Sequence, residues 1–525
     1  MNQNIMNENI QTVLQYHETT KHSQQRYAKS LGYMDWATQP NPFRSYSDTQ
    51  KIELPLSTNN STLPYSLIDE DVPSAPLLKE SLAQFLEFSM GIAAWKESDG
   101  ASWAVRCNAS SGNLHPTESY LILPPVLEEC KEKTSVIHYA PKEHTLETLA
   151  EFESDFWDSL PSGSFIVGLS SISWREAWKY GERAFRYVNL DAGHAWQSLV
   201  VSAKMLGWNI TKLDTTSNAD IHKLMGLNQK SRFHEEEHAD MLLLVSPEIL
   251  SPSQNLDSLV ENLPLFFHGI ANELSPQMHK WEIIDSIEGA TSVDEIPQNR
   301  VISLPVKRVA SQESKEVVLK RRSIHVMDKE SSLISEAEFH TILRSVGDSL
   351  DAKESATHLV LFVHRVQNIP AGLYILVRNK KMLESLKEEM SANFTWKEQE
   401  FSGLYSLHEH DYRLISKTIS CGQDIASDGA FSLGMLSAFS QQLTEYGAHR
   451  YKELYWECGA IGQQLYLEAT SMGLSGTGIG CFLDDMMHDI LGLKSNKFQI
   501  LYHFTLGRGY VDSRIQTKPA YERDS

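Results

Sequence analysis

The chain has 525 residues, of which 41% are hydrophobic and 22% are charged, and its formal net charge at pH 7 is −21. This composition is typical of a soluble globular protein, and the excess of acidic residues disfavours binding to nucleic acid or to an anionic membrane surface. The length exceeds what one ordinary hydrophobic core requires, so two domains or one duplicated unit are expected.

No apolar run reaches the roughly eighteen residues of a membrane-spanning helix. The N-terminal segment MNQNIMNENIQTVLQ has neither the basic start nor the apolar run of a secretory signal, so we expect a cytoplasmic protein with no membrane partner. The cysteines contain no CxxC pair, and their odd number argues against a disulfide framework. We expect all five to be reduced: Cys107, Cys130, Cys421, Cys458 and Cys481.

Near the N-terminus, His17 and His22 in YHETTKHS have no role that the sequence assigns, and a metal there is the less favoured interpretation. The next distinctive segment is NASSGNLHP, residues 108–116, which contains the SSGN loop (residues 110–113). It concentrates small and polar residues between an arginine-bearing segment and the β-rich run SYLILPP. Such a composition predicts a loop.

The spacing HEEEH, from His234 to His238, can bring two imidazoles onto one face of a helix. No third ligand is evident and the order is not HExxH. A solvated acidic helix or loop is therefore favoured, and no metal is predicted.

Two predicted helical stretches, residues 191–209 and 457–475, carry the same pattern. Glycine, glutamine, leucine and alanine recur at an offset of 266 residues, and the register continues without a gap to MGL at 225–227 and LGL at 491–493. This regularity predicts a duplication. The predicted parts are a first domain over residues 1–248, a partly helical connector over residues 249–310 and a second domain over residues 311–525.

Each half alternates helical patterns with short β-rich runs such as GSFIVGLS and FQILYHFTLG. This predicts an α+β fold, with helices around a central mixed or antiparallel sheet in each half. Two like halves predict an intramolecular pseudo-dimer, so the protein is expected to be a monomer of this kind or a homodimer. The halves differ in their loops, because NASSGNLHP has no clear match in VHRVQNIPAG at 363–372 of the second half.

The segment LKRRSIHVMD, residues 319–328, places Arg321, Arg322, Ser323 and His325 together in an otherwise acidic chain. We call it the basic segment. Guanidinium groups beside a hydroxyl suit a phosphate monoester. Taken alone, the run favours the alternative of a solvated helix end.

The segment GLSGTGIGCF, residues 473–482, has four glycines directly after an apolar helix. We call it the glycine segment. Glycines let the backbone approach a flat ligand, but a helix C-cap followed by a turn explains them equally well. The pattern is not GxGxxG after a strand, so no Rossmann site is predicted.

The second half resembles the flavin-dependent nitroreductase superfamily in the order of its segments. These are KRRSIHVMD, GLSGTGIGCF, a DILGL helix and a β-run ending in LGRG. In the first half, RCNASSGNLHPTESYLIL and KYGERAFRYVNLDAGHAWQSL resemble its SagB/ThcOx-type dehydrogenase branch, which includes azoline oxidases of peptide natural-product pathways. The resemblance covers most of both halves. It implies two tandem nitroreductase-like domains fused in one chain.

Such proteins hold one FMN at each dimer interface, so the resemblance implies FMN sites built from both halves. Each half lacks a segment that the other has, so the second interface is expected to be degenerate, with one FMN per chain. His325 stands where the family usually has arginine or lysine. The residues expected to bind FMN are Arg106, Ser110, Ser111, Gly112, Asn113, Arg321, Arg322, Ser323, His325, Gly478, Ile479, Gly480 and Cys481. The arginine of LGRG, expected at position 509, completes the set.

Arg106 matches the branch's arginine before the loop. It either contacts the flavin phosphate or pins the loop through a carboxylate such as Glu118. Lys179 and Tyr180 match a Lys-Tyr pair of the branch that is thought to transfer a proton while the flavin takes hydride. Without the resemblance, such a pair is interpreted as a surface feature.

The resemblance implies an FMN-dependent oxidoreductase that transfers hydride between flavin and a small organic or peptide substrate. Dehydrogenation of an azoline, a thiazoline or oxazoline, is one candidate reaction. The enzymatic alternative is a nitro or quinone reductase with NAD(P)H as electron donor. The alternative from another class is a flavin-binding protein without turnover.

Overall fold

The computed structural model describes residues 3–57, 60–214, 216–292, 308–347 and 355–521. The chain divides into two compact units. The N-terminal unit comprises Ser30–Val301, Glu313–Leu319 and Ile515–Ser525, and the C-terminal unit comprises Met1–Lys29, Ile302–Gln312 and Lys320–Arg514. Among the described residues, none of the helices combines the length and apolar character needed to cross a bilayer.

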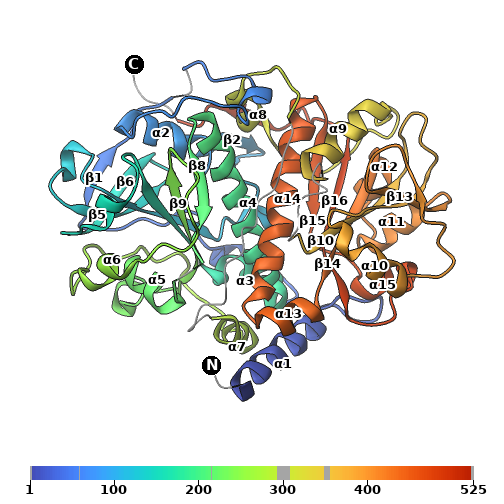
Figure 1. Cartoon of the computed structure of the whole chain (residues 1–525), viewed down its shortest axis with the longest axis horizontal. Helices are drawn as coiled ribbons and strands as arrows, with labels where there is room; N and C mark the ends of the chain where they lie inside the picture. The colour runs from blue at the N-terminus through green and yellow to red at the C-terminus, as the bar shows by residue number, and fades with distance from the viewer. Residues whose placement is uncertain (1–2, 58–59, 215, 293–307, 348–354, 522–525) are drawn as a thin grey trace. The chain divides into compact units, whose positions relative to one another are not determined.

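The N-terminal unit is built on a seven-stranded antiparallel sheet (Figure 1). Its central strands are buried along their whole length, which shows that both faces of the sheet are covered. Helix α4 (Ala184–Met205) packs on strands from one face, and the apolar residues of the other face join a cluster with α5 (Asn218–Leu224), α6 (Asp257–Glu261) and the chain near Phe267. In spatial order the strands are β1 (Gln50–Glu53), β6 (Thr145–Phe152), β5 (Thr134–Ala140), β4 (Thr117–Leu123), β7 (Phe165–Ser171), β9 (His238–Ser246) and β8 (Asn209–Lys212).

The remaining elements of this unit surround that sheet. A second, three-stranded sheet has the order β17 (Gln516–Lys518), β2 (Ile92–Ser98) and β3 (Ala101–Arg106). The other helices are α2 (Lys79–Glu87), α3 (Ser173–Tyr180), α7 (Glu282–Thr291) and α8 (Ser314–Lys320).

The C-terminal unit also has a seven-stranded sheet, and six of its strands repeat the topology of the first. Its first edge strand, residues 397–398, follows two other strands of the sheet in the chain, whereas β1 precedes all the other strands of the N-terminal sheet. Helix α14 (Arg450–Ser471) packs on its sheet as α4 does on the first. The strands, in the corresponding spatial order, are β12 (Lys397–Glu398), β13 (Leu404–Glu409), β11 (Gly372–Leu376), β10 (Thr357–Val363), β14 (Phe431–Ala438), β16 (Phe498–Gly507) and β15 (Ser475–Ile479). The other helices are α1 (Gln3–Thr19), α9 (Glu336–Gly347), α10 (Leu383–Glu389), α11 (Arg413–Ile419), α12 (Ile425–Asp428), α13 (Ser440–Tyr446) and α15 (Asp484–Leu491).

The predicted duplication is visible in the element bounds. Helices α4 and α14 have 22 residues each, and their first residues, like those of β7 and β14 and of α5 and α15, are 266 positions apart. The predicted α+β fold in two tandem domains is confirmed, and each large sheet is antiparallel throughout. One comparison of loops needs correction: residues 364–371 join β10 to β11 and correspond to the connection after β4, not to the SSGN loop before it. The counterpart of the SSGN loop precedes β10, where residues 348–354 lie outside the described part.

The ends of the chain are exchanged between the units, which therefore differ from the predicted domain boundaries. Helix α1 belongs to the C-terminal unit, where the two ring nitrogens of His17 contact the Tyr451 hydroxyl and Gln499 Oε1 at 3.1 Å each. Strand β17 belongs to the N-terminal unit because it pairs with β2. His22 accepts a hydrogen bond from the Ala28 N–H at 3.0 Å, so both histidines have structural partners.

Candidate functional site

In the C-terminal unit, the basic segment runs beside the edge strand β15. Ser323 forms a parallel bridge with Gly476. The Ile324 N–H donates to Thr477 Oγ1 at 2.9 Å, and that hydroxyl donates to the Ile324 carbonyl at 2.7 Å. The fold thereby joins the basic segment to the glycine segment, although these contacts span 153 residues of sequence.

Tyr466 of α14 links the two segments. Its hydroxyl is 2.8 Å from Ser323 Oγ and accepts the Gly478 N–H at 2.8 Å. The Arg321 guanidinium lies over its ring, with Cζ 5.2 Å from the centroid. Arg321 is only 4% exposed, so the expectation of a solvated helix end is wrong for this arginine. Sequence reasoning missed Tyr466, whose only signal is its place in the helix that leads into the glycine segment.

The glycines of this segment are required by its own packing. A Cβ on Gly478 would lie 1.8 Å from the Tyr502 hydroxyl, and one on Gly476 would lie 2.7 Å from the Phe504 ring. Gly473 follows α14 with φ +69°, as a C-capping glycine does. The glycines therefore let β15 pair with β16 while the Tyr502 and Phe504 side chains of β16 occupy their Cβ positions.

Other predicted residues of this unit lie around the two segments. Arg322 donates from Nη1 to its neighbour's carbonyl, that of Arg321, at 2.6 Å, and His325 is exposed. Beyond the glycines already described, Ile479 is buried, whereas Gly480 and Cys481 are half-buried.

The expectation of an arginine at position 509 is wrong by one residue. Position 509 is Gly509, and the arginine of LGRG is Arg508. Gly509 forms an antiparallel bridge with Met327, and a Cβ there would collide with the side chain of Ile324, so no arginine side chain fits at this position. Arg508 is half-buried, and its Nη2 lies 3.8 Å from the Glu338 carboxylate. The arginine of the motif is therefore Arg508, and Gly509 lets the chain after β16 approach the basic segment.

In the N-terminal unit, Asp191 of α4 anchors the SSGN loop. Its carboxylate accepts bonds from Ser110 Oγ at 2.6 Å, from the Ser111 N–H at 2.9 Å and from Ser111 Oγ at 2.8 Å. Burial raises the pKa of Asp191 to about 7, although these hydrogen bonds lower it. The loop is thus fixed by a carboxyl group that titrates near neutrality.

The SSGN loop has an unusual backbone. Gly112, Asn113 and His115 have φ values of +58°, +60° and +50°, a region that residues with a Cβ rarely adopt. Asn113 Nδ2 donates to the Ala104 carbonyl at 2.8 Å and so holds the loop to β3. Strained conformations of this kind cluster at ligand sites and switch regions.

The loop meets the predicted Lys-Tyr pair at Gly112. A Cβ on Gly112 would lie 2.8 Å from the Tyr180 hydroxyl and 3.1 Å from Lys179 Nζ. Lys179 Nζ lies 5.3 Å from the centroid of the Tyr180 ring. The structure therefore places the pair at the end of α3, directly against the loop that was predicted to line the same site.

Glu176, one turn before Lys179 on α3, is a residue that the sequence did not single out. Its side chain is fully buried, and neither carboxylate oxygen has a hydrogen-bond partner among the described residues. Burial and the charge of Asp191 raise its pKa well above the ordinary value, against the opposing effect of Lys179 and Arg175. These effects together favour the neutral, protonated form of Glu176.

Arg106 lies in the interior of the N-terminal unit, with 1% exposure. Its Nη2 donates to the Pro42 carbonyl, and burial lowers its pKa to about 10 although Glu118 raises it. Glu118 accepts a 2.5 Å bond from Arg175 Nη1. This burial agrees with a role of Arg106 in holding the chain before the loop.

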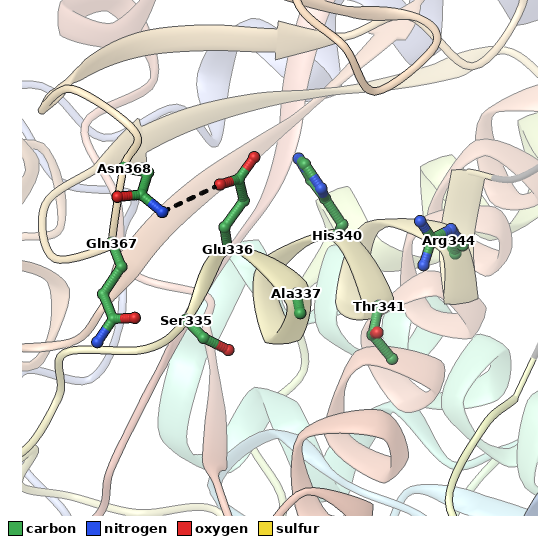
Figure 2. Close-up of a pocket in the computed structure, with 8 residues that line it drawn as sticks. All are labelled: Ser335, Glu336, Ala337, His340, Thr341, Arg344, Gln367 and Asn368. Carbon is green, nitrogen blue, oxygen red and sulfur yellow. Dashed lines mark hydrogen bonds between the residues drawn. The ribbon is translucent and has the colours of Figure 1, made fainter.

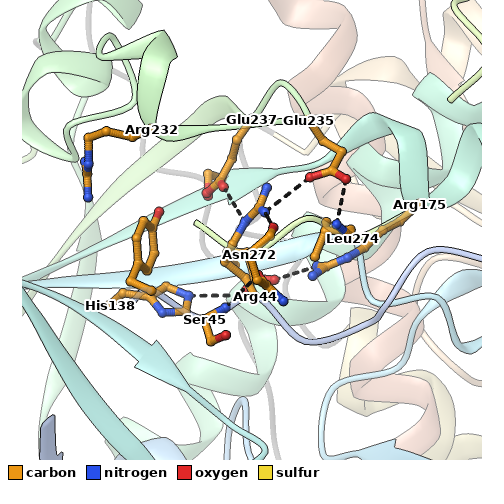
Figure 3. A network of polar contacts seen from close by, with 12 residues as sticks. Arg44, Ser45, His138, Arg175, Arg232, Glu235, Glu237, Asn272 and Leu274 are labelled. Carbon is orange, nitrogen blue, oxygen red and sulfur yellow. Dashed lines mark hydrogen bonds and ion pairs between the residues drawn. The ribbon is translucent and has the colours of Figure 1, made fainter. Parts of the chain in front are cut away.

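The HEEEH segment also differs from its prediction, because two of its glutamates enter a buried network (Figure 3). Arg44 Nη1 lies 3.4 Å from Glu235, and Arg44 Nε lies 3.4 Å from Glu237. Both carboxylates are buried rather than solvated. Nearby, His138 bridges Glu118 and Glu147, which raise its pKa to about 9 against the effect of burial. Among the described residues, no group of three His, Cys, Asp or Glu side chains is arranged to hold a metal.

A surface pocket beside α9 is shown in Figure 2. Its polar lining includes Glu336, His340 and Arg344, and Asn368 Nδ2 donates to Glu336 at 3.4 Å across one edge. The predicted site residues do not line it, so it is separate from both clusters described above.

Comparison with known proteins agrees with the duplicated architecture. A model of the nitroreductase family matches residues 74–234 and 318–508, one region from each half and together more than half of the chain. A solved nitroreductase-type protein from Anabaena variabilis is similar over 95% of this chain and 99% of that chain, with a TM-score of 0.70 and 20% identity, which shows the fold alone. The E. coli microcin synthetase McbBCD complex, solved with truncated pro-MccB17 bound, matches 46% of this chain and 94% of that chain at 18% identity, with a TM-score of only 0.28. No curated protein matches the chain.

Proposed function

The chain belongs to the nitroreductase family, in a tandem two-domain form, and on this premise we propose that it is an FMN-dependent oxidoreductase. One FMN per chain would be held by the basic and glycine segments of the C-terminal unit. The observation that carries the proposal is the Tyr466 hydroxyl, which bonds both Ser323 and the Gly478 N–H.

The residues present fit the phosphate end of such a cofactor. Arg321 supplies a buried guanidinium, Ser323 an exposed hydroxyl next to it, and Arg322 a second cation. Guanidinium and hydroxyl donors bind a phosphate monoester through charge-assisted bonds. The glycines of β15 carry no side chains, so an aromatic ring system could approach their backbone on the side that Tyr502 and Phe504 leave open.

When bound, FMN would supply two-electron hydride chemistry. The protein's own contribution is then proton transfer and positioning. As the resemblance implies, Tyr180 and Lys179 would remove or return the proton that accompanies hydride. Both pack against Gly112, where a Cβ would lie 2.8 Å from the Tyr180 hydroxyl and 3.1 Å from Lys179 Nζ. Dehydrogenation removes a hydride from one atom and a proton from its neighbour, so it needs a base as well as a flavin. Because the chain has the Lys-Tyr pair of the SagB/ThcOx-type branch, azoline dehydrogenation in a modified peptide is our first candidate reaction.

The test begins with flavin content. The purified protein, saturated with FMN and freed of excess, is expected to retain about one FMN per chain. An Arg321→Ala variant should bind FMN about 10- to 100-fold more weakly, because it loses a charged hydrogen-bond donor. Arg413→Ala, at an exposed arginine of the same unit, is the matched control and should bind normally. Absence of FMN binding by the wild type would exclude the proposal.

The reaction itself is tested with two donors. Reduction of bound FMN by a thiazoline-containing peptide, with little reduction by NAD(P)H, supports dehydrogenation. Rapid reduction by NAD(P)H alone would instead favour a nitro or quinone reductase. Lys179→Ala should slow the peptide reaction without changing FMN affinity, and an unchanged rate would remove Lys179 from the mechanism.

A further inference from the structure

Two buried carboxyl groups lie beside the SSGN loop, and the proposed chemistry uses neither. Asp191 bonds both serines of the loop, while Glu176 has no hydrogen-bond partner among the described residues. The two side chains interact electrostatically. We call them the carboxyl pair.

The duplication supplies a reference for this pair. At the offset of 266 residues, Glu176 corresponds to Gln442 and Asp191 to Glu457. Gln442 is a neutral amide, and its Oε1 accepts a 2.9 Å bond from Arg450 Nε. A glutamine has nearly the shape of a protonated Glu176, which is the form that burial favours at this position.

Charge compensation differs between the copies. Burial raises the pKa of Glu457, but Arg378 and Arg450 outweigh this effect and lower it overall. Arg450 corresponds to Ala184 in the N-terminal unit, so that cation is missing beside Asp191. Lys179 and Arg175 of α3 act on Glu176, but burial dominates the pKa of both members of the carboxyl pair.

Protonation of Asp191 does not break its contacts with the loop. A protonated carboxyl group has one donor and remaining acceptor capacity, and a serine hydroxyl can rotate from donor to acceptor. Both Ser110 and Ser111 contact Asp191 through their hydroxyls. The closed loop can therefore take up a proton and keep its bonds, whereas ionised Asp191 is better solvated when the loop is open.

We propose that the carboxyl pair is a proton-linked anchor: the SSGN loop closes against Lys179 and Tyr180 with uptake of protons by Asp191 and Glu176, and opens when these protons are lost. The left-handed backbone at His115, a residue that rarely adopts this conformation, provides strain that opening would release. The anchor acts on the loop whether or not flavin is present. Its effect on catalysis rests on the proposed function.

The anchor is tested by amide hydrogen–deuterium exchange of the flavin-free protein. Exchange of residues 110–115 is measured at pH 6 and pH 8 and corrected for intrinsic rates. With a closed-state pKa of about 7 for Asp191 and an ordinary value near 4 in the open loop, protection should be about tenfold greater at pH 6. The corresponding segment at residues 355–357, which is bonded to Glu457, should be protected equally at pH 6 and pH 8.

Isosteric variants separate the anchor from general stability. Asp191→Asn with Glu176→Gln should flatten the pH dependence at residues 110–115, while Asp158→Asn at an exposed position of the same unit should leave it unchanged. Equal protection at pH 6 and pH 8 in the wild type, or an unchanged tenfold ratio in the double variant, would overturn the proposal.

A second readout connects the anchor to the site. FMN affinity of the wild type should also fall between pH 6 and pH 8, and that of the double variant should not. If the protein binds no FMN, the proposed function fails, but the exchange experiment still decides the anchor. If FMN binds with the same affinity at both pH values while exchange responds, the loop does not contribute to the flavin site.

Discussion

Helices α4 and α14 occupy the same place in the two copies of the fold, and each carries one buried acid that anchors the chain before a central strand. In the C-terminal unit, Glu457 accepts backbone bonds from Ala356 and Thr357 and a 3.0 Å bond from Arg378. In the N-terminal unit, Asp191 bonds two serines. The same structural task is performed once by an ion pair and once by hydroxyl groups.

The difference shows how each copy meets the cost of burying a charge. An ionised carboxylate in the interior is stable only when a cation or several hydrogen bonds compensate it. Glu457 has its arginine, so its pKa, which burial alone would raise, is lowered overall. No arginine pairs with Asp191 in the part of the chain that the structure describes, and burial raises its pKa to about 7 although its bonds to the two serines lower it. We infer that the C-terminal copy is held rigidly and that the N-terminal copy can respond to pH.

Removing the charge of either acid tests this contrast and should give the largest effect. Glu457→Gln leaves Arg378 buried beside a neutral group, and we expect a loss of about 3–5 kcal/mol in the free energy of unfolding. Asp191→Asn removes a charge that burial disfavours, so at pH 8 its stability should lie within about 1 kcal/mol of the wild type or above it. Denaturant titration at pH 8 measures both. Equal losses would contradict the contrast between the copies.

The glycine segment provides the second contrast. Gly478→Ala places a methyl group 1.8 Å from the Tyr502 hydroxyl, and we expect a cost of about 3 kcal/mol from overpacking. The equivalent position in the first copy is Lys212 on β8. The Lys212 side chain is only 11% exposed and pairs with Asp214, so Lys212→Ala should lose stability because it leaves a mostly buried carboxylate unpaired, and not because of overpacking. Unchanged stability of Gly478→Ala would show that the glycine is not required by packing.

The architecture was predictable because the signals for it are periodic and repeated. The 266-residue offset between DAGHAWQSL and ECGAIGQQL predicts the duplication, and the alternating helical and β-rich runs predict the α+β class. The exchanged chain ends could not be predicted, because the pairing of β17 with β2 joins segments separated by most of the chain. Short polar strands of this kind have no periodic signal.

The site was predictable only in part. The basic and glycine segments stood out by composition, and the structure brings them together. Tyr466 and Glu176 did not stand out, because a single tyrosine or glutamate within a helix looks like any amphipathic position. Glu235 and Glu237 were misinterpreted as solvated for a similar reason, since their partner Arg44 lies far away in the sequence. Burial of charge depends on tertiary partners that local patterns do not reveal.

Tyr466 gives a smaller expected loss of stability than Glu457 or Gly478, and the sharpest test of why only one copy would bind flavin. Its counterpart at the 266-residue offset is Val200, so the N-terminal copy lacks this hydroxyl. Tyr466→Phe removes the group that joins Ser323 to the Gly478 N–H, and the loss of two hydrogen bonds should cost about 1–2 kcal/mol of stability. Calorimetry measures this cost, and FMN titration should show weaker binding because Ser323 is no longer held beside the glycine edge. If Tyr466→Phe binds FMN as the wild type does, the hydroxyl link is not what distinguishes the two copies, and the missing basic segment of the first copy would have to explain the difference by itself.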